Sequence, residues 1–204
     1  VLLAKILEAQ GKSEELLPKL RELADQDKRN NTLQFYLADR LMQADALEEA
    51  EQVLERALER SKDPEGYAVL AGIYHKQNKP NELLPTFPPA YAARNQLPAI
   101  VEESNASAEN SELSANVIAE GRKLSDEELD FAHAYVLANL ASRADDESTA
   151  VEYYRKALEK TRVGEQKYAV YEELADELRS QHKPQEAAEV LQQAVDDPSL
   201  VADL

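Results

Sequence analysis

Apolar side chains recur along this chain at steps of three and four residues, and polar side chains fill the positions between them. Ala50, Leu54 and Ala57 show the spacing, which places side chains on one face of an α-helix. Comparable stretches follow one another from end to end, separated by short polar or turn-prone segments. The pattern therefore predicts an all-α protein made of amphipathic helices.

The amphipathic stretches are organised as a repeat. The dipeptide Leu-Ala recurs at successive spacings of 34, 33, 67 and 37 residues, and 67 is about two periods. Its copies are Leu3-Ala4, Leu37-Ala38, Leu70-Ala71, Leu137-Ala138 and Leu174-Ala175. A turn-prone residue follows each copy, at Gly11, Asp45, Asn78, Asp145 and His182. Each unit is therefore predicted to be a helix, a tight turn and a second helix.

This order of small and large residues resembles the tetratricopeptide repeat family, whose unit has about 34 residues. The copies cover residues 1–96 and 126–197. The resemblance implies an all-α, right-handed superhelical solenoid of antiparallel helix pairs, in which neighbouring units share one core. The usual aromatic residue early in the first helix is erratic, and the closing proline is displaced or absent except at Pro64 and Pro198. An unrelated solenoid of α-hairpins with similar packing is the alternative.

The repeat divides the chain into three regions. Residues 1–96 are expected to hold three units, the first one truncated, and residues 126–204 two units plus the start of a further helix. Residues 97–125 are either a degenerate helical unit or a linker, and the near-double spacing of 67 favours a unit. Because the chain opens inside an amphipathic pattern and ends just after an apolar cluster, we expect a piece of a longer protein.

Local signals give two further expectations for the middle of the chain. Pro85, Pro88 and Pro89 fall where the third unit should have its second helix, and interior prolines break helices. A short helical turn near residues 81–84 and a restart at Pro88-Pro89 are therefore predicted. Ser125-Asp126-Glu127-Glu128 forms a capping box, which predicts that the next helix starts there.

Charge is strongly acidic and unevenly distributed. The chain has 40 Asp and Glu against 23 Lys and Arg, a net charge of −17. Residues 1–96 hold 16 acidic and 13 basic side chains, a net of −3, whereas residues 97–204 hold 24 and 10, a net of −14. This argues against nucleic acid as the partner and favours a protein partner with a basic segment. The alternative is that the acids face solvent or stabilise helix starts.

The family resemblance places a binding surface on the concave side of the array. There the first helices of successive units line a groove that commonly receives an extended peptide or a helix. The repeat register puts these partner-binding candidates on the lining: Phe35, Asp39, Met42, His75, Tyr135, Asn139, Glu172, Asp176 and Arg179. Phe35, Met42 and Tyr135 are candidate anchors. Their alternative role is packing against a neighbouring helix, so the assignment requires that Phe35 and Tyr135 be exposed.

The sequence lacks the motifs typical of catalysis and of metal or cofactor binding. It has no Cys, its three His stand in different units, and it lacks phosphate-binding glycine loops and the nucleophile motif Gly-x-Ser-x-Gly. We therefore expect no catalysis, no metal, no cofactor and no membrane span. The favoured function is a protein-interaction scaffold. The alternatives are a self-association module, which would form a homo-oligomer, and a regulatory region of an enzyme encoded elsewhere in the parent chain. The compartment is left open, with the cytoplasm slightly favoured.

Overall fold

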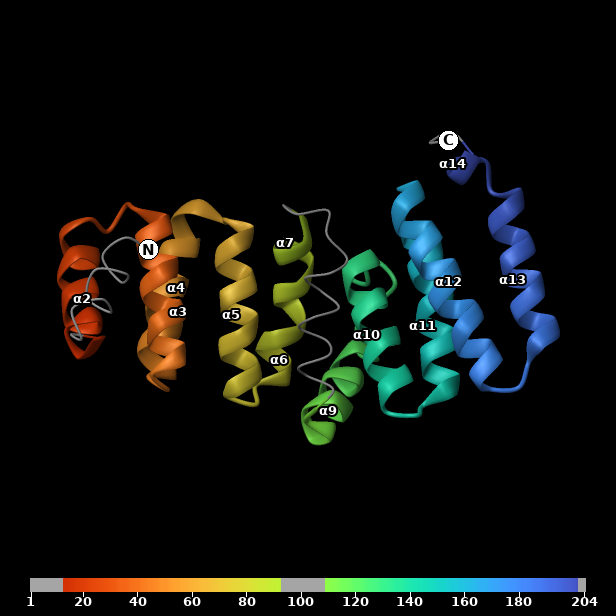
Figure 1. Ribbon diagram of the computed structural model, residues 1–204, viewed down its shortest axis with the longest axis horizontal. Coiled ribbons are helices and arrows are strands. Elements are labelled where there is room, and N and C mark those ends of the chain that lie inside the picture. The colour runs from red at the N-terminus through yellow and green to blue at the C-terminus, as the bar shows by residue number, and fades with distance from the viewer. Residues whose placement is uncertain (1–12, 93–108, 202–204) are drawn as a thin grey trace.

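A computed structural model describes residues 13–92 and 109–201, and within these ranges the chain is helical and has no strand (Figure 1). The first range contains η1 (Ser13–Glu15), α2 (Leu16–Gln26), α3 (Asn31–Gln43), α4 (Leu47–Ser61), α5 (Pro64–Lys76), α6 (Pro80–Leu83), η2 (Leu84–Thr86) and α7 (Phe87–Ala92). The second contains α9 (Ser111–Gly121), α10 (Phe131–Arg143), α11 (Glu147–Lys160), α12 (Gly164–Ser180), α13 (Pro184–Asp196) and α14 (Pro198–Val201).

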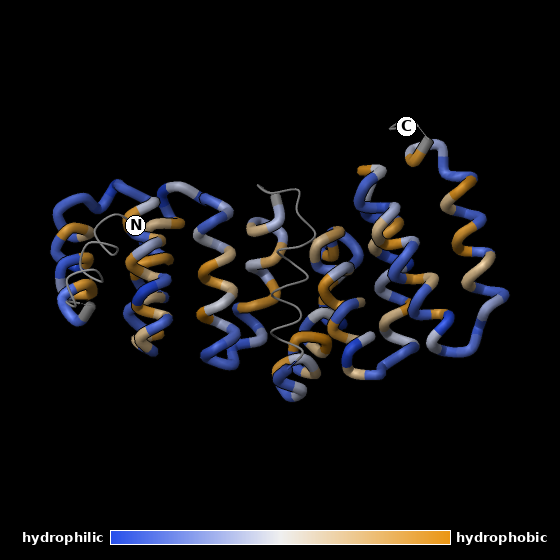
Figure 2. The backbone as a smooth tube through the Cα atoms, viewed as in Figure 1, coloured by the Kyte–Doolittle hydropathy of each residue, from blue (hydrophilic) through white to orange (hydrophobic). Residues whose placement is uncertain are grey.

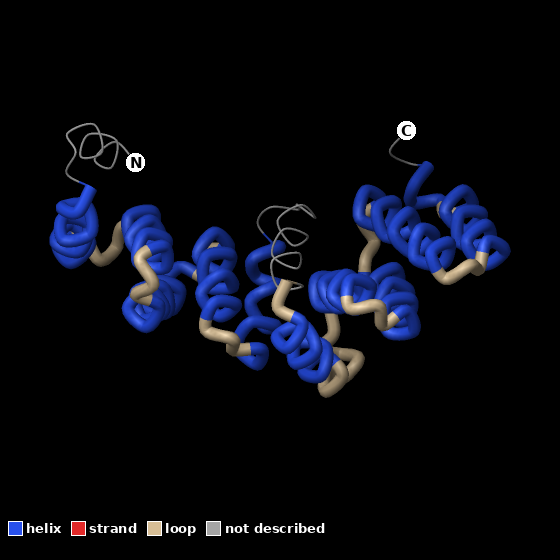
Figure 3. Tube along the Cα trace, turned by 60° about the horizontal axis from the view of Figure 1, so that its bottom comes forward, coloured by secondary structure: helices blue, strands red, loops and turns tan. Residues whose placement is uncertain are grey.

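The helices pack as antiparallel pairs, α3 with α4, α10 with α11 and α12 with α13. The pairs stand side by side in an elongated array, which runs from α2 at one end to α13 at the other. Turned by 60°, the same array is an arc with its middle helices at the lowest point (Figure 3). The all-α solenoid of antiparallel helix pairs expected from the sequence is thereby confirmed.

The turn inside each pair repeats in detail. Its central residue lies in the left-handed region in every described copy, at Asp45 (φ 61°), Asn78 (55°), Asp145 (55°) and His182 (59°). The amide of the next residue donates to the carbonyl five residues before it, as from Ala46 to Leu41 at 2.9 Å. This is the Schellman end of a helix, and Asp and Asn tolerate its positive φ better than most residues. The predicted turns are confirmed at these four residues, and Gly11 lies outside the described ones.

Small residues stand where the paired helices approach most closely. Ala50 and Ala57 of α4, and Ala150 and Ala157 of α11, are all fully buried. In Figure 2 orange, hydrophobic residues recur along the helices between blue, hydrophilic ones. The core is therefore a continuous apolar layer between neighbouring helices, which is typical of a solenoid.

The middle of the array departs from the regular pair. Where a full second helix should follow α5, the chain makes the short α6, the 3-10 turn η2 and then α7, with Pro88 and Pro89 in its first turn. The α-helix is therefore interrupted near the predicted place, but the interruption is the 3-10 turn η2 and no loop separates α6 from α7. α7 packs against both α5 and α10, and α9 adds the buried Leu113, Val117 and Ile118. Residues 93–108 lie outside the described part, so the role of 97–125 as unit or linker stays a prediction.

The helix start predicted at Ser125 is wrong. The capping box itself forms, because the amide and hydroxyl of Ser125 donate to Glu128 Oε2 at 2.9 and 2.7 Å. It closes a single turn, however, and α10 begins only at Phe131, where Asp130 Oδ1 accepts from the His133 amide at 3.0 Å. The intervening Leu129 is buried. The cap at Asp130 and the buried Leu129 therefore place the start of α10 after the capping box at Ser125.

Candidate functional site

Phe35 and Tyr135 are buried, so the expectation that both are exposed on the inner face is wrong. Phe35 is 6% exposed and Tyr135 is 2% exposed. Phe35 lies against the start of α5, where a Cβ added to Gly66 would stand 2.8 Å from its ring. The repeat register places both residues on the first helix of a unit correctly, but neighbouring helices cover them. Neither ring is available as an anchor for a partner.

Tyr135 belongs to a buried row of aromatic rings that joins three helices. Ring centroids are 5.5 Å apart from Tyr91 to Phe131, 5.7 Å from Phe131 to Tyr135 and 6.3 Å from Tyr135 to Tyr154. Burial raises the pKa of Tyr91 and of Tyr135 to about 12. The Gln166 amide donates to the Tyr91 hydroxyl and so ties α7 to α12. The aromatic row is therefore the joint between the middle of the array and its second half.

The other candidates from the first helices have structural partners. Asn139 is buried, and its side-chain amide donates to the Tyr135 carbonyl at 2.9 Å. Met42 is half-buried, with its Sδ 3.3 Å from where a Cβ on Gly72 would stand. Asp39 and His75 are also half-buried. Binding by these residues stays a prediction.

The acidic candidates on α12 are exposed. Glu172 accepts a hydrogen bond from the Tyr168 hydroxyl at 2.8 Å, and Asp176 pairs with Arg179 at 2.7 Å. Both pairs lie within one helical turn and face solvent. Such pairs are weak, so a partner can displace them at little cost.

An acidic pocket of about 460 Å³ lies between the end of α10, the start of α11 and the second half of α12. Its lining consists of Ser142, Asp145, Glu147, Glu173, Asp176, Glu177 and Ser180. Of the candidates named from the sequence, Asp176 is the one that lines it. Glu177 is held in place by the Ser142 hydroxyl at 2.5 Å and the Gln181 amide at 3.0 Å.

The ionised carboxylates of this acidic pocket repel one another. Desolvation, and then the charge of Asp176, raise the pKa of Glu173 above its ordinary value, while Arg143 opposes the shift. No basic side chain lines the pocket among the described residues. A cation placed there would relieve this repulsion, and the arrangement therefore suits a Lys or Arg side chain.

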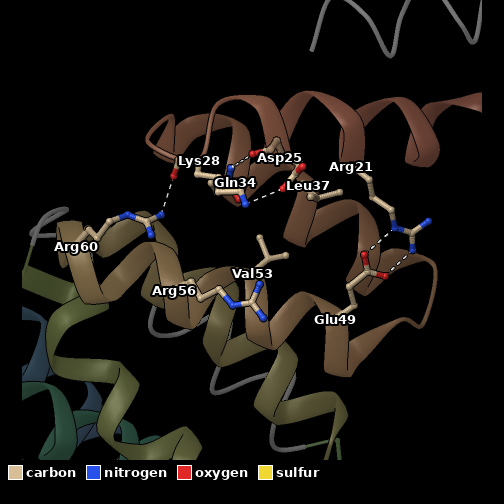
Figure 4. A pocket seen from close by; sticks show the side chains of 10 residues that line it. Arg21, Asp25, Lys28, Gln34, Leu37, Glu49, Val53, Arg56 and Arg60 are labelled. Carbon is tan, nitrogen blue, oxygen red and sulfur yellow. Dashed lines mark hydrogen bonds and ion pairs between the residues drawn. The ribbon is translucent and has the colours of Figure 1, made fainter.

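A second hollow, of about 290 Å³, has the opposite character (Figure 4). We call it the α2–α4 notch. Its lining consists of Arg21, Ala24, Asp25 and Lys28 of α2 and the turn after it, Gln34 and Leu37 of α3, and Glu49, Val53, Arg56 and Arg60 of α4. Gln34 is buried and donates to the Ala24 carbonyl at 2.9 Å, which closes the floor.

The cations of the α2–α4 notch differ in their partners. Arg21 makes a bidentate pair with Glu49 at 2.6 and 2.7 Å, and Lys28 pairs with Asp25 at 2.8 Å. Arg60 donates to the Lys28 carbonyl at 2.7 Å, and Arg56 reaches Gln52 at 3.4 Å. In the described part of the chain neither Arg56 nor Arg60 is paired with a carboxylate.

Sequence reasoning missed the α2–α4 notch, although a signal was present. The α4 residues that line it are spaced by four, three and four, which is one helical face. That spacing defines a helical face, but it does not show that α2 lies opposite this face.

Over residues 13–92 and 109–201, no helix has both the length and the apolar character needed to cross a bilayer. The same residues contain no group of three or more His, Asp or Glu arranged to hold a metal ion.

Comparison with known proteins gives structural matches only. The sequence matches no family description and no curated protein. PilW, a type IV pilus biogenesis factor, matches 98% of this chain and 94% of its own at 17% identity, with a TM-score of 0.47. A tetratricopeptide repeat protein from Parabacteroides merdae matches 97% and 79% at 13% identity, with a TM-score of 0.46. YrrB, described as a TPR protein with an unusual peptide-binding site, matches 90% and 96% at 14% identity, with a TM-score of 0.42.

Proposed function

We propose that this chain is a non-catalytic protein-interaction scaffold, and that its acidic pocket receives a basic segment of a partner protein. The observation that carries the proposal is the gathering of Glu173, Asp176 and Glu177 in one hollow with Asp145 and Glu147. The repeat alone would provide a binding surface, and the carboxylates of the pocket make that surface selective for a basic segment.

Three features of the pocket support a basic side chain as its occupant. Five of its seven lining residues carry carboxyl groups, and it lies in the half of the chain whose net charge is −14. Desolvation, and then the charge of Asp176, raise the pKa of Glu173, as expected where carboxylates gather in one hollow. Ser142 and Ser180 add hydroxyls at the rim, which can bond an incoming Arg or Lys.

The test is a binding titration with a labelled Arg- and Lys-rich peptide, followed by fluorescence anisotropy at low salt. A variant with Glu173→Gln and Asp176→Asn removes two charges while keeping the side-chain volumes. We expect it to bind about tenfold more weakly, since each lost charge pair costs roughly 0.5–1 kcal/mol at a partly exposed site. Added salt should weaken wild-type binding, because the charges are screened.

The matched control removes two exposed carboxylates of the same half outside the pocket, as Glu152→Gln with Glu186→Gln. We expect this control to bind the peptide almost as well as the wild type. Equal weakening by both variants would mean that the acidic surface attracts the peptide as a whole. Failure of the wild type to bind at low salt would contradict the proposed pocket.

A further inference from the structure

We propose that the α2–α4 notch is a second binding site, which takes an acidic peptide segment of a partner protein. Carboxylates of the peptide would pair with Arg56 and Arg60, and an apolar side chain would cover Val53. This site is separate from the acidic pocket, so the scaffold would hold two ligands of opposite charge.

The shape of the notch follows from two helical faces that oppose each other. Glu49, Val53, Arg56 and Arg60 form one face of α4, and Arg21, Ala24 and Asp25 form the facing side of α2. Leu37 of α3 lies between them and is buried. Figure 4 shows the arginines around the opening and Val53 on the α4 side of it. The result is a floor of Leu37, Val53 and the Gln34 amide with a charged rim, which suits a short extended segment.

The net charge of the residues that line the notch is opposite in sign to that of the whole chain. Four of its lining residues are basic and two are acidic, a surplus of two positive charges in a chain of net −17. The two carboxylates are engaged by Arg21 and Lys28. The surplus therefore lies on Arg56 and Arg60. Both side chains belong to α4 and stand one helical turn apart.

The repeat supplies an internal control for this surplus. Because Ala50 corresponds to Ala150, the positions equivalent to Arg56 and Arg60 are Lys156 and Lys160 of α11. There each cation has a carboxylate from its own chain, Glu152 at 2.6 Å for Lys156 and Asp126 at 2.9 Å for Lys160. Lys156 and Lys160 are therefore paired with carboxylates of their own chain, whereas Arg56 and Arg60 are not paired with any carboxylate of the described residues.

The same comparison explains why the notch is hollow. Tyr153 stands at the position equivalent to Val53, and it is 3% exposed. Lys156 lies over its ring, 4.8 Å from the centroid. Val53 has too small a side chain to fill the corresponding space, and it remains half-buried. The counterpart of the notch on α11 therefore carries a larger, buried side chain and two paired cations.

Carboxylate is the group that this geometry recognises best. A guanidinium presents two parallel N–H donors to a carboxylate, and such charge-assisted pairs are stronger than neutral hydrogen bonds. The bond from Arg60 to the Lys28 carbonyl holds that guanidinium across the notch, which reduces the entropy lost on binding. A segment that mixes Glu or Asp with Leu would satisfy both the rim and the floor.

The probe for the experiment is a labelled peptide of Glu residues interrupted by Leu, with a Glu→Gln counterpart. Fluorescence anisotropy at low salt measures its affinity for the whole chain. A variant with Arg56→Gln and Arg60→Gln should bind at least about tenfold more weakly than the wild type. The charge control, Arg155→Gln with Arg162→Gln, removes two exposed arginines of the second half and should leave the affinity within about twofold.

A second variant, Val53→Tyr, tests the notch by its shape. It keeps the net charge and copies the residue at position 153, so it should fill the notch and abolish binding of the acidic peptide. Circular dichroism would verify that each variant is folded. Retained binding by folded Val53→Tyr, or equal losses in the notch variant and the charge control, would overturn the proposal.

Two further measurements distinguish this proposal from the acidic-pocket proposal and from self-association of the chain. Binding of the Arg- and Lys-rich peptide should be unchanged in the notch variants, so failure of one site does not imply failure of the other. Light scattering measures the mass of the free chain. A mass that rises with concentration in the wild type and stays constant in Arg56→Gln with Arg60→Gln would assign the notch to a second copy of this chain and overturn the partner-peptide proposal.

Discussion

The acidic pocket and the α2–α4 notch are built by the same repeat at different places and with opposite charge. The acidic pocket lies where α10 and α12, the first helices of neighbouring units, meet the turn after α10. The notch lies between α2 and α4, the second helices of neighbouring units. The comparison teaches that the repeat fixes where hollows can form, while a few surface residues decide what each hollow attracts.

The largest expected difference between the two halves is in stability. Tyr153→Ala removes a buried ring from α11 and should lower the free energy of unfolding by about 3 kcal/mol. Val53→Ala, at the equivalent and half-buried position, should cost about 1 kcal/mol or less. Urea unfolding followed by circular dichroism measures both. Equal losses would show that Val53 is packed as tightly as Tyr153, which would contradict the hollow.

Gln34 gives the next largest effect, because it closes the floor of the notch. Its amide donates to the carbonyls of Ala24 and Asp27, and the equivalent residue of the second half is Ala134. Gln34→Ala therefore copies the second half, and it leaves two carbonyls without their donor. We expect a loss of about 1–2 kcal/mol in urea unfolding. An unchanged midpoint would mean that water replaces the amide at no cost.

The ion pairs of the second half should contribute less. Asp126→Asn with Glu152→Gln releases Lys160 and Lys156 from their carboxylates, and exposed pairs are worth about 0.5 kcal/mol each or less. The affinity for the acidic peptide should increase by less than about threefold, since Tyr153 still fills the space. A gain as large as the loss in the notch variant would show that charge alone determines binding.

The smallest effect concerns pH and the acidic pocket. Because the pKa of Glu173 is raised in the folded chain, the folded state binds more protons than the unfolded state at pH values between the two pKa values. Its stability therefore falls as pH rises through that window. Glu173→Gln lacks this loss, so its midpoint in urea should rise slightly relative to wild type as pH increases from the ordinary Glu pKa of about 4.3 through the raised pKa of the folded chain. A constant difference across this range would contradict the raised pKa.

Much of the fold could be predicted because its determinants are local. Asp45, Asn78, Asp145 and His182 were identified as turn residues, and each one has a positive φ. The proline cluster correctly marked the interruption of the α-helix between α6 and α7. Ser125 shows the limit, since its capping box forms but α10 begins only after Asp130. A local signal predicts a cap without deciding how long the capped helix becomes.

The candidate site could be predicted less well, because it depends on which helix covers which face. The register placed Phe35 and Tyr135 on first helices, but only packing against Gly66 in one case and Phe131 and Tyr154 in the other makes them core residues. Asp176 does line a pocket. The notch depends on the difference between Val53 and Tyr153, which becomes meaningful once the two helices are seen to be equivalent.

The most direct test of the central claim is an NMR titration of the isotope-labelled chain with the two peptides in turn. The basic peptide should shift amide resonances at the end of α10, the start of α11 and along α12. The acidic peptide should shift those of α2, α3 and α4, and both sets should appear together when both peptides are present. Shifts spread evenly over the array, or the same residues responding to both peptides, would contradict two separate sites of opposite charge.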